Sequence, residues 1–255
     1  MSGGAVTTVA GGGSVFGDDG PATKAQLTAP EGLADGGGKL FIADVNRVRA
    51  VSNGTITTAA GNGSVGYQGD SGPATAARLS SPAGVAVVSS GDLWIADSGN
   101  DRVRLVSGGT ITTVAGNGTY GFAGGNGAPT SATLGMPVGL AADASGDIYI
   151  TEAYRVLKVS KGKITSIAGL NAPQGVVVDS AGSVYVADPS SHRVVVLTPA
   201  AAACAVSATP AAPQYAATGG TFTVAIQTKA SCSWTVENLP AWIGAGARMA
   251  RVPAP

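Results

Sequence analysis

The sequence is poor in the side chains that most often carry chemistry. Its 255 residues include one histidine, His192, and two cysteines, Cys204 and Cys232. A zinc site built from several histidines is therefore excluded, and a Ser-His-Asp triad would depend on His192 alone. The cysteines form no metal-spaced cluster with other ligands. We therefore expect no catalytic residue, no metal and no other cofactor, and we predict that the chain is not an enzyme.

Charged residues and long apolar runs are also scarce. Charged residues make up 12% of the chain, and the fifteen basic and fifteen acidic residues cancel. Because no cluster of Lys and Arg stands out, we expect no nucleic-acid partner. No apolar run approaches the ~18–20 residues of a membrane span. Residues 1–13 lack the charged and apolar regions of a signal peptide, so we expect none in this chain.

Glycine, in contrast, is abundant, with 39 residues gathered between short hydrophobic runs where turns need them. Four copies of one pattern follow each other along the chain. The phrase "ITTVAGNG" at Ile111 has counterparts at Val6, Ile56 and Ile164, and "PAGVAV", "LWIAD" and "RVRLV" recur in the same order. Each copy therefore contains four short strands separated by turn residues. Such units about 50 residues apart are typical of β-propeller blades, so the sequence predicts an all-β propeller of four blades.

The two ends of the repeat region each carry an incomplete blade. Residues 6–10 form a lone fourth strand, and the last repeat stops after its third strand, at residues 194–197. A closed ring in which residues 6–10 complete the last blade would use both leftovers and remove two exposed edges. A propeller cut from a longer gene would show the same leftovers. Of the two, we favour ring closure.

The repeats resemble the NHL family of β-propellers, in the subtype found in bacterial surface or secreted proteins. The stretch "PAGVAVVSSGDLWIADSGNDRVRLVSGGTITTVAGNG" carries the pattern almost throughout, and the resemblance covers roughly residues 5–198. It implies a propeller over residues 1–198 and an extracellular or periplasmic location. His192 occupies the position of the family's common Asn-His-Arg turn, which implies a structural role for this histidine.

After residue 198 the composition changes. Residues 199–203 are rich in Ala and Pro, as in a linker. Residues 204–243 contain "TFTVAIQT" and "CSW" and resemble the first half of the BACON module, a small β-sandwich suggested to bind carbohydrate or mucin. We expect a partial sandwich there and an irregular tail over residues 244–255. Cys204 and Cys232 form a disulfide if the protein is exported, or remain free thiols.

Recurrent polar and aromatic residues are expected on one face of the propeller, because the turns after the second strands and the insertions before the first strands emerge on the same side. Acidic residues in these turns would hold a cation or a sugar hydroxyl, or else form ion pairs that fix the turns. Their repetition in every copy favours the structural alternative. Aromatic residues in the insertions would stack on sugars or peptide side chains, or else pin flexible loops. The candidate ligand-binding residues are Phe16, Tyr67, Tyr120, Phe122, Asp44, Asp97, Asn100 and Asp188.

The glycine-rich insertion of residues 117–133 has no counterpart before the last repeat, where Gly169 is followed directly by Leu170. We therefore expect this insertion to decorate the fold, and its deletion to leave the thermal transition almost unchanged. The predicted function is a non-enzymatic scaffold that binds a protein or glycan at the face described above. The alternatives are a metal-dependent lyase or hydrolase of the propeller type, and an extracellular sensor or adhesin fragment.

Overall fold

A computed structural model describes residues 4–198, 207–210 and 224–227 of the chain. The chain divides into two units, residues 1–198 and 199–255, and each is described by itself. Among the described residues, no helix is long and apolar enough to cross a membrane.

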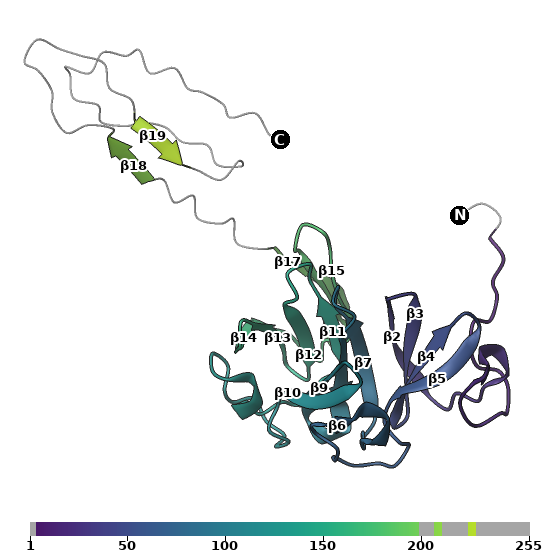
Figure 1. Cartoon of the computed structure of the whole chain (residues 1–255). Helices are drawn as coiled ribbons and strands as arrows, with labels where there is room; N and C mark the ends of the chain where they lie inside the picture. The colour runs from purple at the N-terminus through teal and green to yellow at the C-terminus, as the bar shows by residue number, and fades with distance from the viewer. Residues whose placement is uncertain (1–3, 199–206, 211–223, 228–255) are drawn as a thin grey trace, which may run out of the picture. The chain divides into compact units, whose positions relative to one another are not determined.

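The first unit consists of antiparallel sheets that follow the sequence repeats one by one (Figure 1). Blade 1 has the strand order β1-β5-β4-β3-β2, and blade 2 the order β6-β10-β9-β8-β7. Blade 3 has the order β11-β12-β13-β14, and blade 4 the order β15-β16-β17. The prediction of an all-β, four-bladed propeller is confirmed.

The strands are short and end at the glycines, aspartates and asparagines of the repeats. Their bounds are β1 Gly20–Pro21, β2 Pro30–Gly36, β3 Lys39–Asp44, β4 Arg47–Ser52 and β5 Thr55–Ala60 in blade 1; β6 Gly72–Pro73, β7 Pro82–Val87, β8 Leu93–Asp97, β9 Arg102–Ser107 and β10 Thr110–Ala115 in blade 2; β11 Gly139–Ala142, β12 Ile148–Glu152, β13 Arg155–Ser160 and β14 Lys163–Gly169 in blade 3; and β15 Val176–Val178, β16 Val184–Asp188 and β17 Arg193–Leu197 in blade 4. Single turns of 3-10 helix interrupt the connections: η1 Ala22–Lys24, η2 Ala74–Ala76, η3 Ser98–Asn100, η4 Pro129–Ser131 and η5 Pro189–Ser191.

The hydrophobic core lies between neighbouring blades. One cluster joins Phe41 and Val48 of blade 1 to Val85 and Ile95 of blade 2, and similar clusters join blade 2 to blade 3 and blade 3 to blade 4. The innermost strands β2, β7, β11 and β15 contact each other in that order. Each blade therefore depends on its neighbour for burial of its apolar face, as in other repeat proteins.

A glycine in each of the innermost strands β2, β7 and β11 sets how closely neighbouring blades approach. A Cβ atom on Gly32 would overlap the carbonyl oxygen of Ala83, and one on Gly84 would overlap that of Val138. Gly139 lies in the same way against the carbonyl of Gln174. Because a protein backbone cannot yield as a side chain does, only glycine permits this spacing.

The predicted closure of the ring by the N-terminal strand is wrong. Blade 4 contains three strands, and residues 6–10 form no strand in the described part of the chain. Val6 is fully exposed, at 102% of its reference area. The physical reason is that blade 4 does not pack on blade 1: Gly32, Gly84 and Gly139 each lie against a carbonyl of the next blade, whereas a Cβ atom on Gly175 would meet only Ala187, at 4.0 Å. The N–H of Gly11 donates to the carbonyl of Ala22, as the N–H groups of Gly61 and Gly116 donate to Ala74 and Pro129, so the first insertion is fixed to blade 1 in the same way as the other insertions are fixed to their blades.

The long insertion of residues 117–133 belongs to the core, contrary to our expectation that it only decorates the fold. Ala132 and the adjoining Leu134 are 1% and 0% exposed and pack in the cluster between blades 2 and 3. The insertion also pairs with the outer strand of blade 3, because Asn126 N–H donates to the Ile164 carbonyl at 2.7 Å and Ile164 N–H donates to the Gly127 carbonyl at 3.0 Å.

In the second unit, the described residues form one antiparallel strand pair. β18 Ser207–Pro210 pairs with β19 Val224–Gln227, and β19 lies within the predicted strand "TFTVAIQT". The other residues of the BACON-like segment 204–243, including Cys204 and Cys232, lie outside the described residues, as do the linker 199–203 and the tail 244–255.

Candidate functional site on the insertion face

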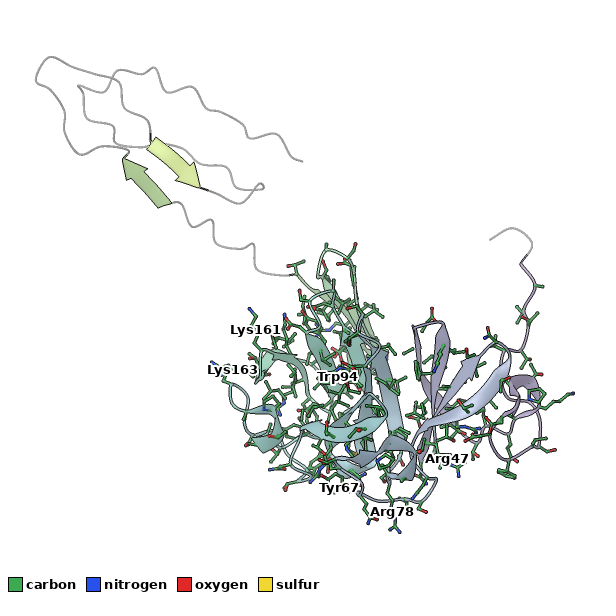
Figure 2. The ribbon with its side chains drawn as sticks, in the orientation of Figure 1. Arg47, Tyr67, Arg78, Trp94, Lys161 and Lys163 are labelled. Atoms are coloured by element: carbon green, nitrogen blue, oxygen red, sulfur yellow. The ribbon has the colours of Figure 1, made fainter. Side chains whose placement is uncertain are left out.

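The turns and insertions gather on one face of the first unit, here called the insertion face. Pro30, at the start of β2, is paired with Asp44 at the end of β3, and Pro82 is paired with Asp97 in the same way. Each turn after a second strand therefore lies beside the end of the preceding insertion. In the view of Figure 2, Tyr67 lies toward this face, and Lys161, in the turn between β13 and β14, lies toward the other.

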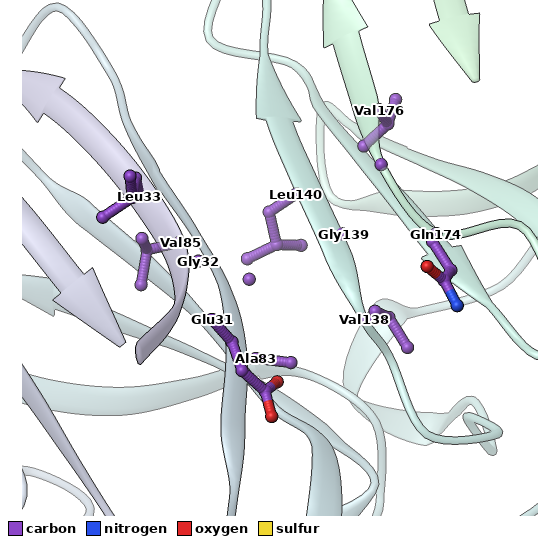
Figure 3. Close-up of a pocket in the computed structure, with 12 residues that line it drawn as sticks. Glu31, Gly32, Leu33, Ala83, Val85, Val138, Gly139, Leu140, Gln174 and Val176 are labelled. Carbon is purple, nitrogen blue, oxygen red and sulfur yellow. The ribbon is translucent and has the colours of Figure 1, made fainter. Parts of the chain in front are cut away.

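A central channel of about 460 Å³ runs between the four innermost strands (Figure 3). Its walls are aliphatic and glycine-rich, with Leu33, Val85 and Leu140 among the lining residues. Of the twelve lining residues, Glu31 and Gln174 carry the polar side chains, and both precede the glycines of the innermost strands. This channel was not predicted from the sequence, although the glycine that recurs after each "Px" pair is a signal of it.

The acidic residues at the ends of the second strands are buried and hold the backbone in front of the first strands. Asp44 is 8% exposed, whereas Asp97, Glu152 and Asp188 are each 0% exposed. In every blade the carboxylate accepts a hydrogen bond from a main-chain N–H: Thr28 and Ala29 at 2.8 Å for Asp44, Ser80 at 2.7 Å for Asp97, Gly135 at 2.8 Å for Glu152, and Asn171 at 3.2 Å for Asp188. This geometry favours the structural alternative for these acids.

In blade 2, Asp97 belongs to a buried polar network. Arg104, which is 0% exposed, lies 3.2 Å from Asp97 and also pairs with Asp70 at 2.5 Å. Asn100 donates from its amide to Asp97 and to the Gly66 carbonyl, both at 2.8 Å. Burial raises the pKa of Asp97, although the hydrogen bonds and the Arg104 charge oppose this effect. Asp97 and Asn100 therefore hold the turn and the insertion together.

Tyr67 anchors the second insertion. Its hydroxyl donates to Asp70 at 2.7 Å, and the Arg102 guanidinium lies 3.8 Å from the centre of its ring. Burial acts to raise the pKa of Asp70, but hydrogen bonds from Tyr67 and Thr113 and the Arg104 charge together lower it below its ordinary value. These contacts favour the pinning role for Tyr67.

The predicted aromatic residues Tyr120 and Phe122 come together with a third ring, Tyr154, in what we call the aromatic cluster. The ring centres of Tyr120 and Phe122 are 5.5 Å apart and those of Phe122 and Tyr154 are 5.4 Å apart, both in edge-on geometry. The three side chains remain 55%, 38% and 58% exposed. Sequence reasoning missed Tyr154, although "TEAYR" places a tyrosine where other repeats have small or polar turn residues.

Within the aromatic cluster, Phe122 is fixed by contacts with Gly135 and Arg155. Phe122 packs on the backbone of Gly135 so closely that a Cβ atom there would overlap its ring. Arg155 donates to the Phe122 carbonyl at 2.6 Å and to the Thr133 carbonyl at 3.2 Å, and it pairs with the buried Glu152. Met136, next to Gly135, is 54% exposed.

Two other predicted positions lie apart from these networks. Phe16, in the first insertion, is 77% exposed, and the ring pairs of the described residues do not include it. His192 is exposed and adopts the left-handed backbone conformation, with φ of 53°, at the end of η5. Within the described part of the chain, no three His, Cys, Asp or Glu side chains are grouped so that they could hold a metal ion.

Comparison with known proteins agrees with this repeat structure. The family model of the NHL repeat matches residues 79–104, in blade 2, and residues 170–197, in blade 4. The chain contains NHL repeats. Each matched NHL repeat spans the first three strands of its blade, from the innermost strand to the third. No curated protein matches the sequence.

Solved structures with the same fold share little sequence with these NHL repeats. A streptogramin B lyase is 17% identical with a TM-score of 0.46, and the match covers 76% of this chain and 59% of the lyase, so the chain spans less than two thirds of that protein. A gluconolactonase from Xanthomonas campestris is 15% identical with a TM-score of 0.46, and the match covers 68% of this chain and 73% of the gluconolactonase. An auxiliary nutrient binding protein from Bacteroides ovatus is 16% identical with a TM-score of 0.50, and the match covers 67% of this chain and 48% of the binding protein.

These comparisons correct one expectation from the sequence. We predicted that the chain is not an enzyme, but propellers of this fold include proteins named as a lyase and a gluconolactonase. The prediction is contradicted, because structural neighbours of this chain are named as enzymes. At these identities the likeness shows the fold alone, and no residue role is carried over.

Proposed function

We propose that the chain is a binding module whose aromatic cluster contacts a protein partner. The observation that carries the proposal is the group of three half-exposed rings, Tyr120, Phe122 and Tyr154, fixed in edge-on contact on the insertion face. Grouped exposed aromatic side chains on an otherwise polar surface commonly mark interaction sites.

The composition of the site supports a protein as the partner. Aromatic residues, methionine and arginine are enriched at the centres of protein interfaces. Arg155 lies against Phe122 of the aromatic cluster, and the half-exposed Met136 follows Gly135, on which Phe122 packs. Because the Phe122 ring is already packed on Gly135 and lies 5.6 Å from the Arg155 guanidinium, ordering this ring on binding costs little side-chain entropy.

A glycan is less well matched to this surface. Sugar hydroxyls need hydrogen-bond partners next to the stacking ring. The nearby carboxylates are already engaged, because Glu152 is buried against Arg155 and Gly135, and Asp101 accepts a hydrogen bond from Met136 N–H at 3.0 Å. The partner that we propose therefore offers an apolar surface.

The resemblance to surface and secreted NHL proteins supports a location outside the cytoplasm. The BACON-like segment of residues 204–243, which resembles part of a module suggested to bind carbohydrate, belongs to the same proposal. A second contact to a glycan would then come from that segment and not from the aromatic cluster.

The proposal is tested by comparing partner capture between matched variants. The double variant Tyr120→Ser/Tyr154→Ser removes two exposed rings, and we expect it to lose at least ~10-fold in affinity for a captured protein, as for hot-spot residues. Phe16→Ser, which removes a more exposed ring outside the aromatic cluster, serves as control and should bind normally. Equal binding by all three proteins would overturn the proposal, and binding to a glycan array that depends on Tyr120 and Tyr154 would identify a glycan instead.

A further inference from the structure

The outer end of blade 4 has the features of a blade that awaits a neighbour. β17 presents Val194 and Val196, which are 72% and 49% exposed, and its outer edge has no fourth strand among the described residues. Gly175 occupies the place that Gly32, Gly84 and Gly139 hold in the other blades, but the nearest atom to a Cβ there is 4.0 Å away. The space taken elsewhere by the next blade is therefore open.

The N-terminal end of blade 1 has the complementary features. Residues 6–10 read "VTTVA", the same phrase as the fourth strands β5 and β10, yet Val6 and Val9 are 102% and 56% exposed. Ile56 and Ile111, which hold the place of Val6 in β5 and β10, are 1% and 0% exposed. The N-terminal phrase therefore has the sequence of a buried strand without the partner that would bury it.

The backbone directly after residue 10 has the same conformation as the backbone directly after the paired fourth strands β5 and β10. Gly11 has φ of 84°, against 84° at Gly61 and 83° at Gly116, the glycines that end β5 and β10. Each of these three glycines faces a leucine of its insertion, namely Leu27, Leu79 and Leu134. However, Gly61 and Gly116 also press on a turn carbonyl of the preceding blade, at Asn46 and Asp101, and Gly11 has no such neighbour.

From these observations we infer that the chain associates head to tail, with residues 6–10 of one copy adding as the fourth strand to β17 of a second copy. The register is given by β4 and β5, where Val48 pairs with Ala60 and Val51 with Ile56. Transferred to the two copies, this register pairs Val194 with Ala10, Val195 with Thr8, Val196 with Thr7 and Leu197 with Val6.

The same arrangement would give the Arg193 side chain a hydrogen-bond acceptor and would fill the open space beside Gly175. Arg193 has a side chain that is 56% exposed, whereas its counterparts Arg47 and Arg102 donate to the carbonyls of Asn62 and Asn117 behind the fourth strand. In the assembly, Arg193 would donate to the Gly12 carbonyl of the second copy. The Glu31 carbonyl of that copy would lie against Gly175, as the Ala83 carbonyl lies against Gly32.

A head-to-tail contact uses different surfaces on the two copies, so it builds either closed rings or open chains. The mass of the full-length chain, measured by light scattering or sedimentation across a concentration series, should exceed that of the monomer and rise with concentration. Two variants separate the two surfaces. Val6→Asp removes the donor strand, and Gly175→Ala fills the acceptor space, with Gly169→Ala as a control at a glycine whose Cβ would also meet no atom within 4 Å.

Each of the two variants alone should be monomeric, with an unfolding midpoint equal to that of the dilute wild-type chain, and Gly169→Ala should associate normally. An equimolar mixture of Val6→Asp and Gly175→Ala should form a complex of two chains and nothing larger, because one copy keeps the donor and the other keeps the acceptor. A wild-type chain that stays monomeric at high concentration would overturn the inference. A mixture that stays monomeric while the wild-type chain associates would overturn it as well, by showing a symmetric contact.

Discussion

At the scale of single residues, the innermost glycines control the distance between blades. Replacing Gly84 with alanine would place a Cβ atom within overlap distance of the Val138 carbonyl. Because backbone atoms cannot rotate away from the overlap as a side chain can, we expect a loss of at least about 2 kcal/mol in the free energy of unfolding. Gly175→Ala is the matched control, because the space there is open, and it should change the stability of the monomer by less than about 0.5 kcal/mol. Denaturant titration measures both, and equal losses would show that the spacing is not set by these glycines.

Asp70 gives a residue-scale prediction that depends on pH. It pairs with the buried Arg104, and its pKa in the folded protein is lowered below the ordinary value of an aspartate. Because the pKa is lower in the folded than in the unfolded protein, the ionised carboxylate stabilises the fold at any pH above its pKa in the unfolded chain. This stabilisation is lost as the pH falls through the pKa of the folded protein. Asp70→Asn should therefore cost about 1–3 kcal/mol at pH 7, toward the lower end because solvent reaches Asp70.

The difference in the free energy of unfolding between wild type and Asp70→Asn should narrow as the pH falls through the lowered pKa of Asp70 in the folded protein. Urea titrations at pH 7 and at acid pH measure it, with Asp35→Asn as control because Asp35 is exposed and forms none of the described ion pairs. A difference that widens at low pH would contradict the lowered pKa.

At the scale of elements, the insertion of residues 117–133 is part of blade 3. Its deletion removes Ala132 from the core and the two hydrogen bonds between residues 126–127 and Ile164. We expect the free energy of unfolding to fall by about 2–4 kcal/mol, in contrast to the expectation from sequence. Thermal and denaturant unfolding measure it, with Thr119→Ala at an exposed position of the same insertion as control. An unchanged transition would restore the view of the insertion as a decoration.

The strands were predictable because each repeat carries its own period-2 pattern and turn residues, which are local signals. The role of the insertion was not, because the burial of Ala132 and Leu134 comes from contacts with other blades that no local pattern encodes. The candidate site divides in the same way. Tyr120 and Phe122 stood out as aromatics in a glycine-rich segment, whereas Tyr154 joins them only because the fold brings its turn beside that segment.

At the scale of the whole molecule, the first unit is a row of blades in which stability depends on neighbours. Blades 2 and 3 each share a hydrophobic cluster with a blade on both sides, whereas blade 4 shares one with blade 3 alone among the described residues and has three strands. In a one-dimensional array of this kind, end units open more readily than internal ones. The two end blades are also where ring closure was expected and is not found.

Hydrogen exchange on the monomeric Val6→Asp chain should therefore show a gradient along the array. Amides of β16 and β17 should exchange faster than those of β8, β9, β12 and β13, because local opening of blade 4 breaks one inter-blade core and opening of an internal blade breaks two. The comparison is made at the same pH and temperature, with the exposed turn at Lys161 as the reference for unprotected amides. Uniform protection across all four blades would contradict this prediction. It would mean that the unit unfolds only as a whole, and that one neighbouring blade stabilises blade 4 as much as two neighbours stabilise each internal blade.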